Sequence, residues 1–324
     1  MTPALASFQT DSMKHVLEAQ QFNKKLIGQV FEMAERMEQV VESGGNDLLR
    51  GKVMASVFYT ISTRTRLSFE AAMLRLGGKV ISTEHPEAFS DTVFASNLED
   101  TVRMVDRYVD VIVLRHPEEG STERAAKVSR VPVINAGGGG QHPTQALLDL
   151  YTIYRAKDGI DGVSVLVMGN LANSRTGRSL CYLLAKYSGV KIWLVSPEEL
   201  SMRQDIIDYL ERHQVSFVQI HEPGEELEQA LQQVEVVYQT DLPRDFDYGP
   251  TGLSRQAFCI NMDMLGLMRK HAIIMHPFPR MDGIAPEVDT DPRAHYFQQI
   301  TNGLYIRMAL LQMILAPETL GKQI

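Results

Sequence analysis

The sequence predicts an α/β fold made of two parallel-sheet halves, and three observations support this prediction. Short apolar, β-favouring segments alternate with segments of helical periodicity along most of the chain, as in parallel sheets whose strands are joined by helices. The chain has 324 residues, enough for two domains of the usual size of about 150 residues. Four glycines at residues 137–140 and a turn at residues 157–159 interrupt the alternation near its middle, so we expect one half on each side.

The first half begins with a predicted helix at residues 13–43. Apolar side chains recur there every three or four positions until Gly44 and Gly45 end the pattern. Residues 53–59 are apolar and β-favouring, which predicts a buried strand. The same criteria predict helices at 65–76, 98–108 and 121–129, and strands at 80–83, 109–114 and 131–135. Residues 84–97 are polar and irregular.

The second half repeats this alternation. Apolar, β-favouring runs predict strands at residues 163–168, 190–195, 215–219, 234–239 and 272–275. Helical periodicity predicts helices at residues 144–154, 175–187, 202–213, 225–233 and 303–315.

The composition excludes several classes of protein. Apolar residues make up 44% and charged residues 22% of the chain, which is a globular rather than a disordered composition. The net charge of −8 provides no general basic field for nucleic acid. Two cysteines cannot form a disulfide framework or a four-cysteine zinc site. Without a signal segment or an apolar run of about 18 residues, we expect a cytoplasmic protein with no membrane partner.

The clearest local motif is the run Ser62, Thr63, Arg64, Thr65 and Arg66 between a predicted strand and a predicted helix. Backbone N–H groups at a helix start lack intrahelical partners and carry partial positive charge. A phosphate placed there would gather those donors together with hydroxyls and a guanidinium. The alternative interpretation is that Ser62 or Thr63 only caps the helix and the arginines face solvent.

Three further side chains lie where a parallel α/β sheet binds ligands. Arg115 ends a predicted strand, and such sheets bind ligands beyond the carboxyl ends of their strands. His142 follows the glycine run and starts a helix, with Gln145 in the next turn. The alternatives are a surface arginine and a structural histidine.

Two loops of the second half also follow predicted strands. Residues 169–177 occupy the place of a dinucleotide fingerprint but lack the GxGxxG spacing, which argues against a dehydrogenase. Arg175 in this loop is placed to bind an anion instead. In the loop at residues 275–280, Pro277 and Pro279 fix the backbone, so it either presents carbonyls rigidly or is an ordinary turn.

Together these motifs resemble the aspartate/ornithine carbamoyltransferase family, most closely its aspartate carbamoyltransferase catalytic chains. The matching stretches run in order over nearly the whole chain, at residues 62–70, 98–120, 142–152, 169–184, 275–280 and 294–311. The combination of Ser-Thr-Arg-Thr-Arg with His-Pro-Thr-Gln is highly specific.

The resemblance implies a fold, an assembly and an activity. The expected fold has two parallel-sheet α/β domains with an active-site cleft between them. Residues 1–150, completed by a C-terminal helix at 301–324, would bind carbamoyl phosphate, and residues 151–300 would bind the acceptor. The family transfers a carbamoyl group to an amine, nominally L-aspartate in pyrimidine biosynthesis, as a homotrimer whose neighbouring subunits complete each site. It uses no metal or organic cofactor.

The resemblance also assigns roles to individual residues. The implied phosphate ligands are Ser62, Thr63, Arg64 and Thr65. The residues implied to address the carbamoyl group are Arg115, His142, Gln145 and the carbonyls of Pro277 and Phe278, with Arg64, Arg115, His142 and Gln145 counted as catalytic. Arg175 would bind an acceptor carboxylate.

Several positions depart from the family pattern. Phe94 replaces the lysine of a mobile loop that reaches into the neighbouring site, although Ser90 retains the loop serine. Thr60 replaces a glutamate before the first motif. Asp241 and Pro243 replace the arginine and glutamine that hold the aspartate side chain. The loop before His142 consists only of glycines.

These departures leave three hypotheses open. The first is an active carbamoyltransferase with an altered acceptor that carries a cation, because the ornithine branch has an aspartate at a place similar to Asp241. The second is a catalytically impaired paralogue that keeps the fold and acts as a binding or assembly partner. The third is a module that binds phosphate or carbamoyl phosphate without turnover.

Overall fold

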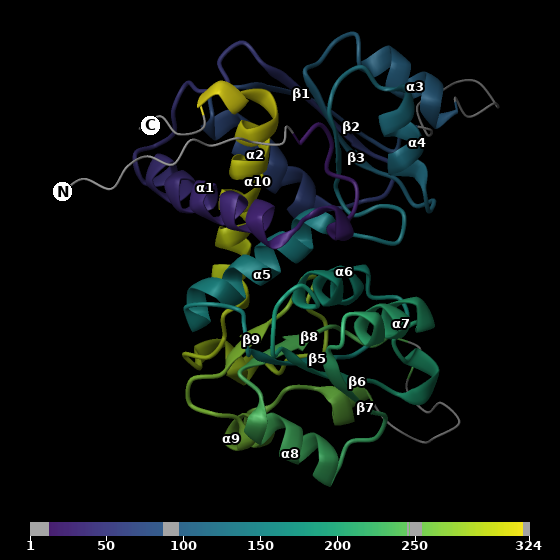
Figure 1. The fold of residues 1–324 in the computed structure, drawn as a ribbon, viewed down its shortest axis with the longest axis vertical. Helices are drawn as coiled ribbons and strands as arrows, with labels where there is room; N and C mark the ends of the chain where they lie inside the picture. Colours follow the sequence, from purple (N-terminus) through teal and green to yellow (C-terminus); the bar gives the residue numbers. More distant parts are fainter. Residues whose placement is uncertain (1–12, 87–96, 245, 247–254, 320–324) are drawn as a thin grey trace. The chain divides into compact units, whose positions relative to one another are not determined.

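The computed structural model describes residues 13–86, 97–244, 246 and 255–319. The chain forms two compact units (Figure 1). Unit 1 comprises residues 1–144 together with 302–324, and unit 2 comprises residues 145–301. Each unit contains one parallel β-sheet with connecting helices, which confirms the predicted α/β class.

The sheet of unit 1 has four parallel strands in the order β2-β1-β3-β4. The strands are β1 (Val53–Phe58), β2 (Lys79–Glu84), β3 (Val111–Arg115) and β4 (Val133–Asn135). Successive strands are joined by α2 (Thr63–Arg75), α3 (Leu98–Val105) and α4 (Ser121–Val128). From β1 the chain moves to one edge of the sheet and later to the other, so the topological switch point lies between the carboxyl ends of β1 and β3.

The burial of these strands explains their sequence pattern. Nearly every residue of β1 and β3 is buried, because helices cover both faces of a parallel sheet, and such strands read as continuous apolar runs. Strand β2 lies at the sheet edge and is mostly exposed or half-buried.

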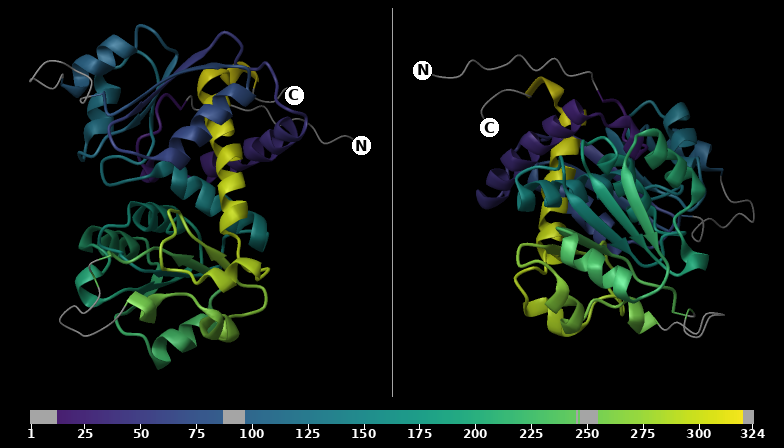
Figure 2. Two further views of the ribbon diagram at one scale, coloured as in Figure 1. Left: turned by 180° about the vertical axis from the view of Figure 1, so that it is seen from behind. Right: turned by 60° about the horizontal axis from the view of Figure 1, so that its bottom comes forward.

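The sheet of unit 2 has five parallel strands in the order β7-β6-β5-β8-β9. The strands are β5 (Ser164–Met168), β6 (Lys191–Val195), β7 (Ser216–Ile220), β8 (Val236–Gln239) and β9 (Ile273–Met275). The helices are α5 (Pro143–Lys157), α6 (Arg175–Leu184), α7 (Gln204–Arg212), α8 (Glu225–Gln233) and α9 (Met262–Leu267), the last of which the sequence does not predict. Helices α6 and α7 lie on one face and α8 and α9 on the other (Figures 1 and 2). The switch point lies between β5 and β8.

The prediction of one helix over residues 13–43 is wrong at its start. Helix α1 runs only from Lys24 to Glu42, and the side chain of Asn23 caps it by accepting a hydrogen bond from Leu26 N. Upstream, Val16 forms a β-bridge with Ile134 beside strand β4. Val16 is apolar because it pairs with the sheet edge, and its spacing from the apolar residues of α1 matches a helical period only by coincidence.

The C-terminal helix is longer than predicted. Helix α10 runs from Tyr296 to Leu315, so Gly303 lies inside it rather than at its start. Its later part belongs to unit 1, where Arg307 donates a hydrogen bond to Ser68 Oγ over 2.8 Å. The guanidinium of Arg307 also lies over the ring of Phe69.

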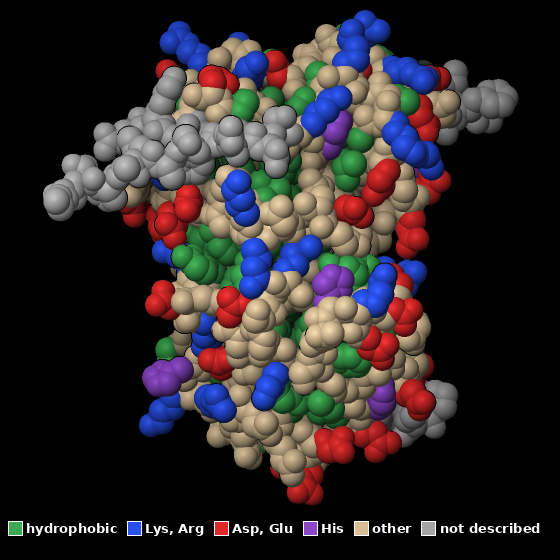
Figure 3. Space-filling view, in the orientation of Figure 1, with side chains coloured by type: hydrophobic (Ala, Val, Ile, Leu, Met, Phe, Trp, Pro, Cys, Tyr) green, Lys and Arg blue, Asp and Glu red, His purple; other side chains and the backbone are tan. Residues whose placement is uncertain are grey.

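The surface carries charges of both signs. On the face drawn in Figure 3, acidic and basic side chains are interspersed over each unit. Within the described residues, no helix is both long enough and apolar enough to cross a membrane.

Candidate active site

The first cluster of predicted site residues lies at the switch point of unit 1. Ser62 occupies the N-cap position of α2, but its side chain makes no capping hydrogen bond there, so the interpretation of Ser62 as a simple cap is not supported. Ser62 and Thr65 are buried, whereas Thr63 and Arg64 are exposed. Partial burial lowers the pKa of Arg64, yet an arginine remains charged. The helix start therefore presents unpaired N–H groups beside hydroxyls and a cation.

Arg115 stands at the carboxyl end of β3, across the switch point from the end of β1. In the register of the sheet it pairs with Phe58. Its Nε donates to Thr60 Oγ1 over 3.0 Å and its Nη1 donates to the carbonyl of Ala136 over 3.2 Å. Both acceptors are neutral, so the positive charge of Arg115 is positioned without being neutralised by either of them.

His142 is buried beside the same helix start. Its Nε2 lies 3.5 Å from Thr65 Oγ1 and its Nδ1 lies 3.5 Å from Thr144 Oγ1, the long end of hydrogen-bond range. Gly137 separates His142 from Arg115: a Cβ at this position would lie 2.4 Å from His142 Cδ2 and 2.8 Å from Arg115 Nη1. The first glycine of the run thus lets these two side chains approach the same point.

Asn135 is a site-supporting residue that the sequence reasoning missed. This buried residue ends β4, and its Oδ1 accepts hydrogen bonds from Gly137 N (2.9 Å) and Gly138 N (2.8 Å). It fixes the glycine loop that passes between Arg115 and His142. The available signal was an asparagine between a buried strand and a glycine run, which favours such side chain to backbone bonds.

The second cluster lies at the switch point of unit 2, in a depression of about 260 Å³. Three loops line it, and each follows the carboxyl end of a strand. The lining residues are Asn170, Asn173, Ser174, Arg175 and Thr176 after β5, Thr240 and Asp241 after β8, and His276, Pro277, Phe278, Pro279 and Met281 after β9. Arg175 and Asp241 therefore face one depression, which brings a cation and a carboxylate into the same site.

Arg175 is the first residue of α6 and is half-buried. The preceding Ser174 caps the helix by accepting a hydrogen bond from Gly177 N over 3.0 Å. Burial lowers the pKa of Arg175, but the guanidinium stays charged. An anion in the depression would meet both this charge and the positive end of the helix.

Asp241 is held by the loop that follows β9. Its Oδ2 accepts a hydrogen bond from Met281 N (2.9 Å) and its Oδ1 from Gly283 N (2.8 Å). Partial burial by itself raises the pKa of Asp241, but His276 and the two backbone donors outweigh burial and hold that pKa below its ordinary value. Asp241 is thus a fixed negative charge at the wall of the depression.

His276 connects Asp241 to the predicted Pro277–Phe278 loop. Its Nδ1 accepts a hydrogen bond from Phe278 N over 2.9 Å, so the neutral ring carries its proton on Nε2. That Nε2 lies 3.5 Å from Asp241 Oδ2. Phe278 has a positive φ of 56°, an unusual backbone state for a bulky residue that tends to occur at functional sites. The contacts of His276 with Phe278 N and with Asp241 therefore hold this loop in one conformation.

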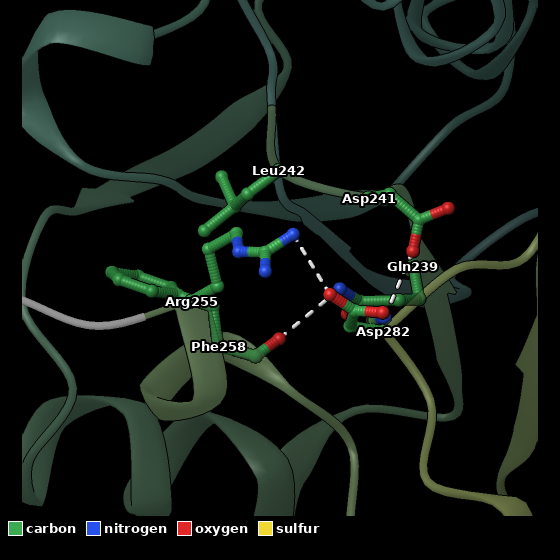
Figure 4. A pocket seen from close by; sticks show the side chains of 7 residues that line it. Gln239, Asp241, Leu242, Arg255, Phe258 and Asp282 are labelled. Carbon is green, nitrogen blue, oxygen red and sulfur yellow. Dashed lines mark hydrogen bonds and ion pairs between the residues drawn. The ribbon is translucent and has the colours of Figure 1, made fainter. Parts of the chain in front are cut away.

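Asp241 also lines a second, smaller cavity together with Gln239, Leu242, Arg255, Phe258, Asp282 and Gly283 (Figure 4). Arg255 directs its guanidinium at Asp282 there, with 2.8 Å between the charged atoms. The amide of Gln239 donates to the carbonyls of Thr240 and Phe258. These bonds fix the end of β8 and hence the position of Asp241.

Replacing Gly283 by alanine is expected to destabilise this loop. A Cβ at Gly283 would lie 2.7 Å from Asp241 Oδ1 and 3.0 Å from Gln239 Nε2, so the Asp241 bond to Gly283 N must lengthen or break. We expect the free energy of unfolding to fall by about 1–3 kcal/mol, measured by urea denaturation. Gly266→Ala is the matched control, because a Cβ at Gly266 meets no atom within 4 Å. Equal stability of the two variants would contradict this account.

The remaining predicted residues are placed as follows. Gln145 is buried on α5, where its Nε2 donates to Asp149 Oδ1 over 2.9 Å. Pro277 and Phe278 are half-buried. Ser90 and Phe94, predicted for the neighbour loop, lie outside the described residues. In the part of the chain that the structure describes, no group of three or more His, Cys, Asp or Glu side chains could hold a metal ion.

Comparison with known proteins identifies the family. Residues 14–155 match the aspartate/ornithine carbamoyltransferase, carbamoyl-P binding domain, and residues 161–314 match the Asp/Orn binding domain of the same family. Aspartate carbamoyltransferase 1, chloroplastic, from Pisum sativum is 47% identical over 97% of this chain and 81% of its own length. The aspartate carbamoyltransferase catalytic subunit from Methanopyrus kandleri is 46% identical over 93% of this chain and 97% of its own.

Solved structures agree with this assignment. The catalytic subunit of aspartate transcarbamoylase from M. jannaschii has a TM-score of 0.86 at 39% identity, covering 94% of this chain and 99% of that one. Aspartate transcarbamoylase from Trypanosoma cruzi in complex with carbamoyl aspartate and phosphate has a TM-score of 0.85 at 34% identity, covering 94% and 96%. The chain therefore belongs to the aspartate/ornithine carbamoyltransferase family of transferase enzymes.

Proposed function

We propose that this protein transfers the carbamoyl group of carbamoyl phosphate to an amine that is not L-aspartate. The observation that carries the change of acceptor is the fixed carboxylate of Asp241 in the same depression as Arg175. Family membership supports the transfer reaction itself. The relatives named above are aspartate carbamoyltransferases, so aspartate is the acceptor against which the proposal is tested.

Carbamoyl phosphate is proposed to bind with its phosphate at the start of α2. Ser62, Thr63, Arg64 and Thr65 supply hydroxyls, backbone N–H groups and a guanidinium to the phosphate oxygens. Arg115 and His142 donate to the carbamoyl oxygen, with Arg115 also near the phosphate. The NH2 group donates to Gln145 and to the carbonyls of Pro277 and Phe278.

These roles account for the chemistry. The amine nitrogen attacks the carbamoyl carbon, a C–N bond forms, and the C–O bond to phosphate breaks. The proton lost by the amine ends on the phosphate that leaves, so the reaction balances without a redox partner. Fixed donors on the developing oxyanion and on the leaving phosphate lower the barrier, and holding both substrates in position removes much of the entropic cost.

The acceptor is proposed to carry one carboxylate and a neutral or cationic second group. Arg175 would bind the carboxylate. Asp241 would repel the second carboxylate of aspartate, and the loss of a charge-assisted hydrogen bond at this position alone costs about 1.5–3 kcal/mol, with like-charge repulsion added. A positively charged group would instead be stabilised by Asp241.

A panel of amines tests this proposal. Carbamoyl phosphate consumption is measured with L-aspartate, L-ornithine, diamines, neutral amino acids and no amine. We expect saturable turnover with a cationic or neutral acceptor and negligible saturation by L-aspartate at millimolar concentration. Ordinary saturable turnover of aspartate would refute the altered acceptor and leave only the carbamoyltransferase assignment.

A catalytically impaired paralogue is the second candidate, favoured by the replacement of a family glutamate by Thr60. The Thr60 hydroxyl accepts a hydrogen bond from Arg115 but supplies no negative charge to orient it. For such a protein no amine in the panel would accelerate carbamoyl phosphate consumption. Phosphate would still raise the melting temperature through binding at the start of α2, and the Arg64→Ala variant would lose most of that shift.

We also propose a homotrimer in the cytoplasm, with Ser90 and Phe94 contributed to a neighbouring subunit. Unit 1 exposes four large apolar side chains close together in the chain. Leu67 and Leu74 lie on α2, Ile61 precedes that helix, and Ile81 lies on the edge strand β2. Leu67 and Leu74 are seven residues apart and share one helix face, and such exposed apolar groups are typical of an interface. Light scattering at micromolar concentration is expected to give three times the chain mass. A monodisperse monomer would contradict this assembly.

A further inference from the structure

The carboxylate of Asp149 is buried on α5 and has no role in the mechanism above. It is wholly inaccessible to solvent and accepts three side-chain hydrogen bonds. Gln145 Nε2 and Gln299 Nε2 donate to Oδ1 over 2.9 and 2.6 Å, and Tyr238 OH donates to Oδ2 over 2.7 Å. A buried charge is costly unless it is paired or well hydrogen-bonded, and these three donors offset that cost at Asp149.

One branch of this network determines which end of the Gln145 amide faces away from the helix. A glutamine amide has a donating NH2 and an accepting oxygen at opposite ends. Because Asp149 Oδ1 can only accept, it holds the NH2 end of Gln145, and the carbonyl oxygen is the end presented to other groups. A carbonyl oxygen is the partner that the NH2 of a carbamoyl group requires.

The other branch leads to the Pro277–Phe278 loop. Asp149 orients the Gln299 amide in the same way, and Gln299 Oε1 accepts a hydrogen bond from His276 N over 2.9 Å. The His276 ring in turn accepts from Phe278 N. One buried carboxylate is thereby connected, through two amides of fixed orientation, to both groups that we propose as acceptors for the carbamoyl NH2.

We propose that Asp149 is a positioning residue for carbamoyl recognition, acting through Gln145 and through Gln299 and His276. This inference rests on the proposed function of Gln145, Pro277 and Phe278. Burial and the charge of Asp149 raise the pKa of Tyr238 well above its ordinary value, so Tyr238 remains a donor on the opposite oxygen. The hydrogen bond from Tyr238 therefore stabilises the buried Asp149 carboxylate, but Tyr238 belongs to neither branch.

The test compares three variants by kinetics and by the preference for carbamoyl phosphate over inorganic phosphate in calorimetric binding. Asp149→Ala is expected to lower kcat/KM by about 100-fold and to abolish most of that preference, while inorganic phosphate itself binds as in the parent. Asp149→Asn retains an acceptor oxygen of the same shape and should keep activity within about tenfold. Tyr238→Phe is the matched control: it removes a buried bond to the same carboxylate and should lower stability but leave the preference unchanged.

Three results would overturn the inference. The first is a folded Asp149→Ala variant with the parent's preference, and the second is a loss of preference in Tyr238→Phe as large as in Asp149→Ala. If Asp149→Ala does not fold, the Gln299→Met variant removes only the branch through Gln299 and His276. The third contradicting result is a Gln299→Met variant whose preference for carbamoyl phosphate over inorganic phosphate equals that of the parent. Failure of the proposed function is distinct from all three, since the parent itself would then show no preference and no carbamoylation.

Discussion

The Arg115→Ala variant is expected to lose about 1000-fold in kcat/KM for carbamoyl transfer, the order lost when a preorganised donor to a transition-state oxyanion is removed. Arg115 is held at the end of β3 by Thr60 and by the carbonyl of Ala136, so its guanidinium is oriented before a substrate arrives. Alanine removes both the charge and this geometry. Steady-state kinetics at saturating acceptor measure the effect.

Two companion variants separate this loss from a general change in charge. Arg103→Ala removes an arginine of the same unit that is exposed on α3 and paired with Asp100, and it should leave kcat/KM unchanged. Arg115→Lys keeps the charge but loses the planar fork, so it should recover only part of the activity. If Arg115→Ala retains more than about a tenth of the parent activity, Arg115 is a structural residue.

The Asp241→Arg variant is expected to be destabilised by about 1–3 kcal/mol and to gain no turnover of L-aspartate. Met281 N and Gly283 N both lose their acceptor; the exposed Met281 N can bond to water instead, so the cost arises mainly at the partly buried Gly283 N. Replacing Asp241 alone therefore weakens the loop after β9 without returning the other donors of the family pattern at residues 94 and 243. Urea denaturation and aspartate kinetics measure the two effects.

Asp241→Asn is the control for the charge, since it keeps one accepting oxygen. Because the pKa of Asp241 is lowered in the folded protein, its contribution to stability is fully present above the unfolded pKa of about 3.9 and is lost as the pH falls through the folded pKa. The stability difference between the parent and Asp241→Asn should therefore shrink as the pH is lowered below about 4. A constant difference, or aspartate turnover by Asp241→Arg alone, would contradict the role given to this carboxylate.

Restoring aspartate turnover should need several replacements together. The triple variant Phe94→Lys, Asp241→Arg and Pro243→Gln returns three donors of the family pattern and should exceed both the parent and Asp241→Arg in aspartate turnover, because residues that act on one ligand are not additive. Steady-state kinetics with L-aspartate compare the three proteins. A triple variant no better than the single one would show that other residues determine the acceptor.

The sequence predicted the α/β alternation because buried parallel strands such as β1 and β3 are continuous apolar runs. It failed at residues 13–23 and at the start of α10. Pairing of Val16 with Ile134 is long-range, and a glycine inside a helix looks locally like a boundary. Local periodicity carries no information about either arrangement.

The candidate site was predicted unevenly for a similar reason. The positions of Arg115 and Arg175 follow from their places at strand and helix ends, where parallel sheets bind ligands. The hydrogen bonds of Asp241 with Met281 and Gly283 join residues about forty positions apart in the sequence. The hydrogen bond between Gln299 and Asp149 joins residues 150 positions apart. Such contacts depend on tertiary packing, which a single sequence does not display.

Unit 1 is built from two separate stretches of chain, with all of unit 2 between them, and this arrangement affects protein synthesis. A ribosome completes strands β1 to β4 long before it makes the part of α10 in which Arg307 meets Ser68 and Phe69. Unit 2 is continuous, and its whole chain is made before this part of α10. Unit 1 can therefore be completed only after unit 2 has been synthesised, and Ser68 and Phe69 lack their contacts with Arg307 until late in translation.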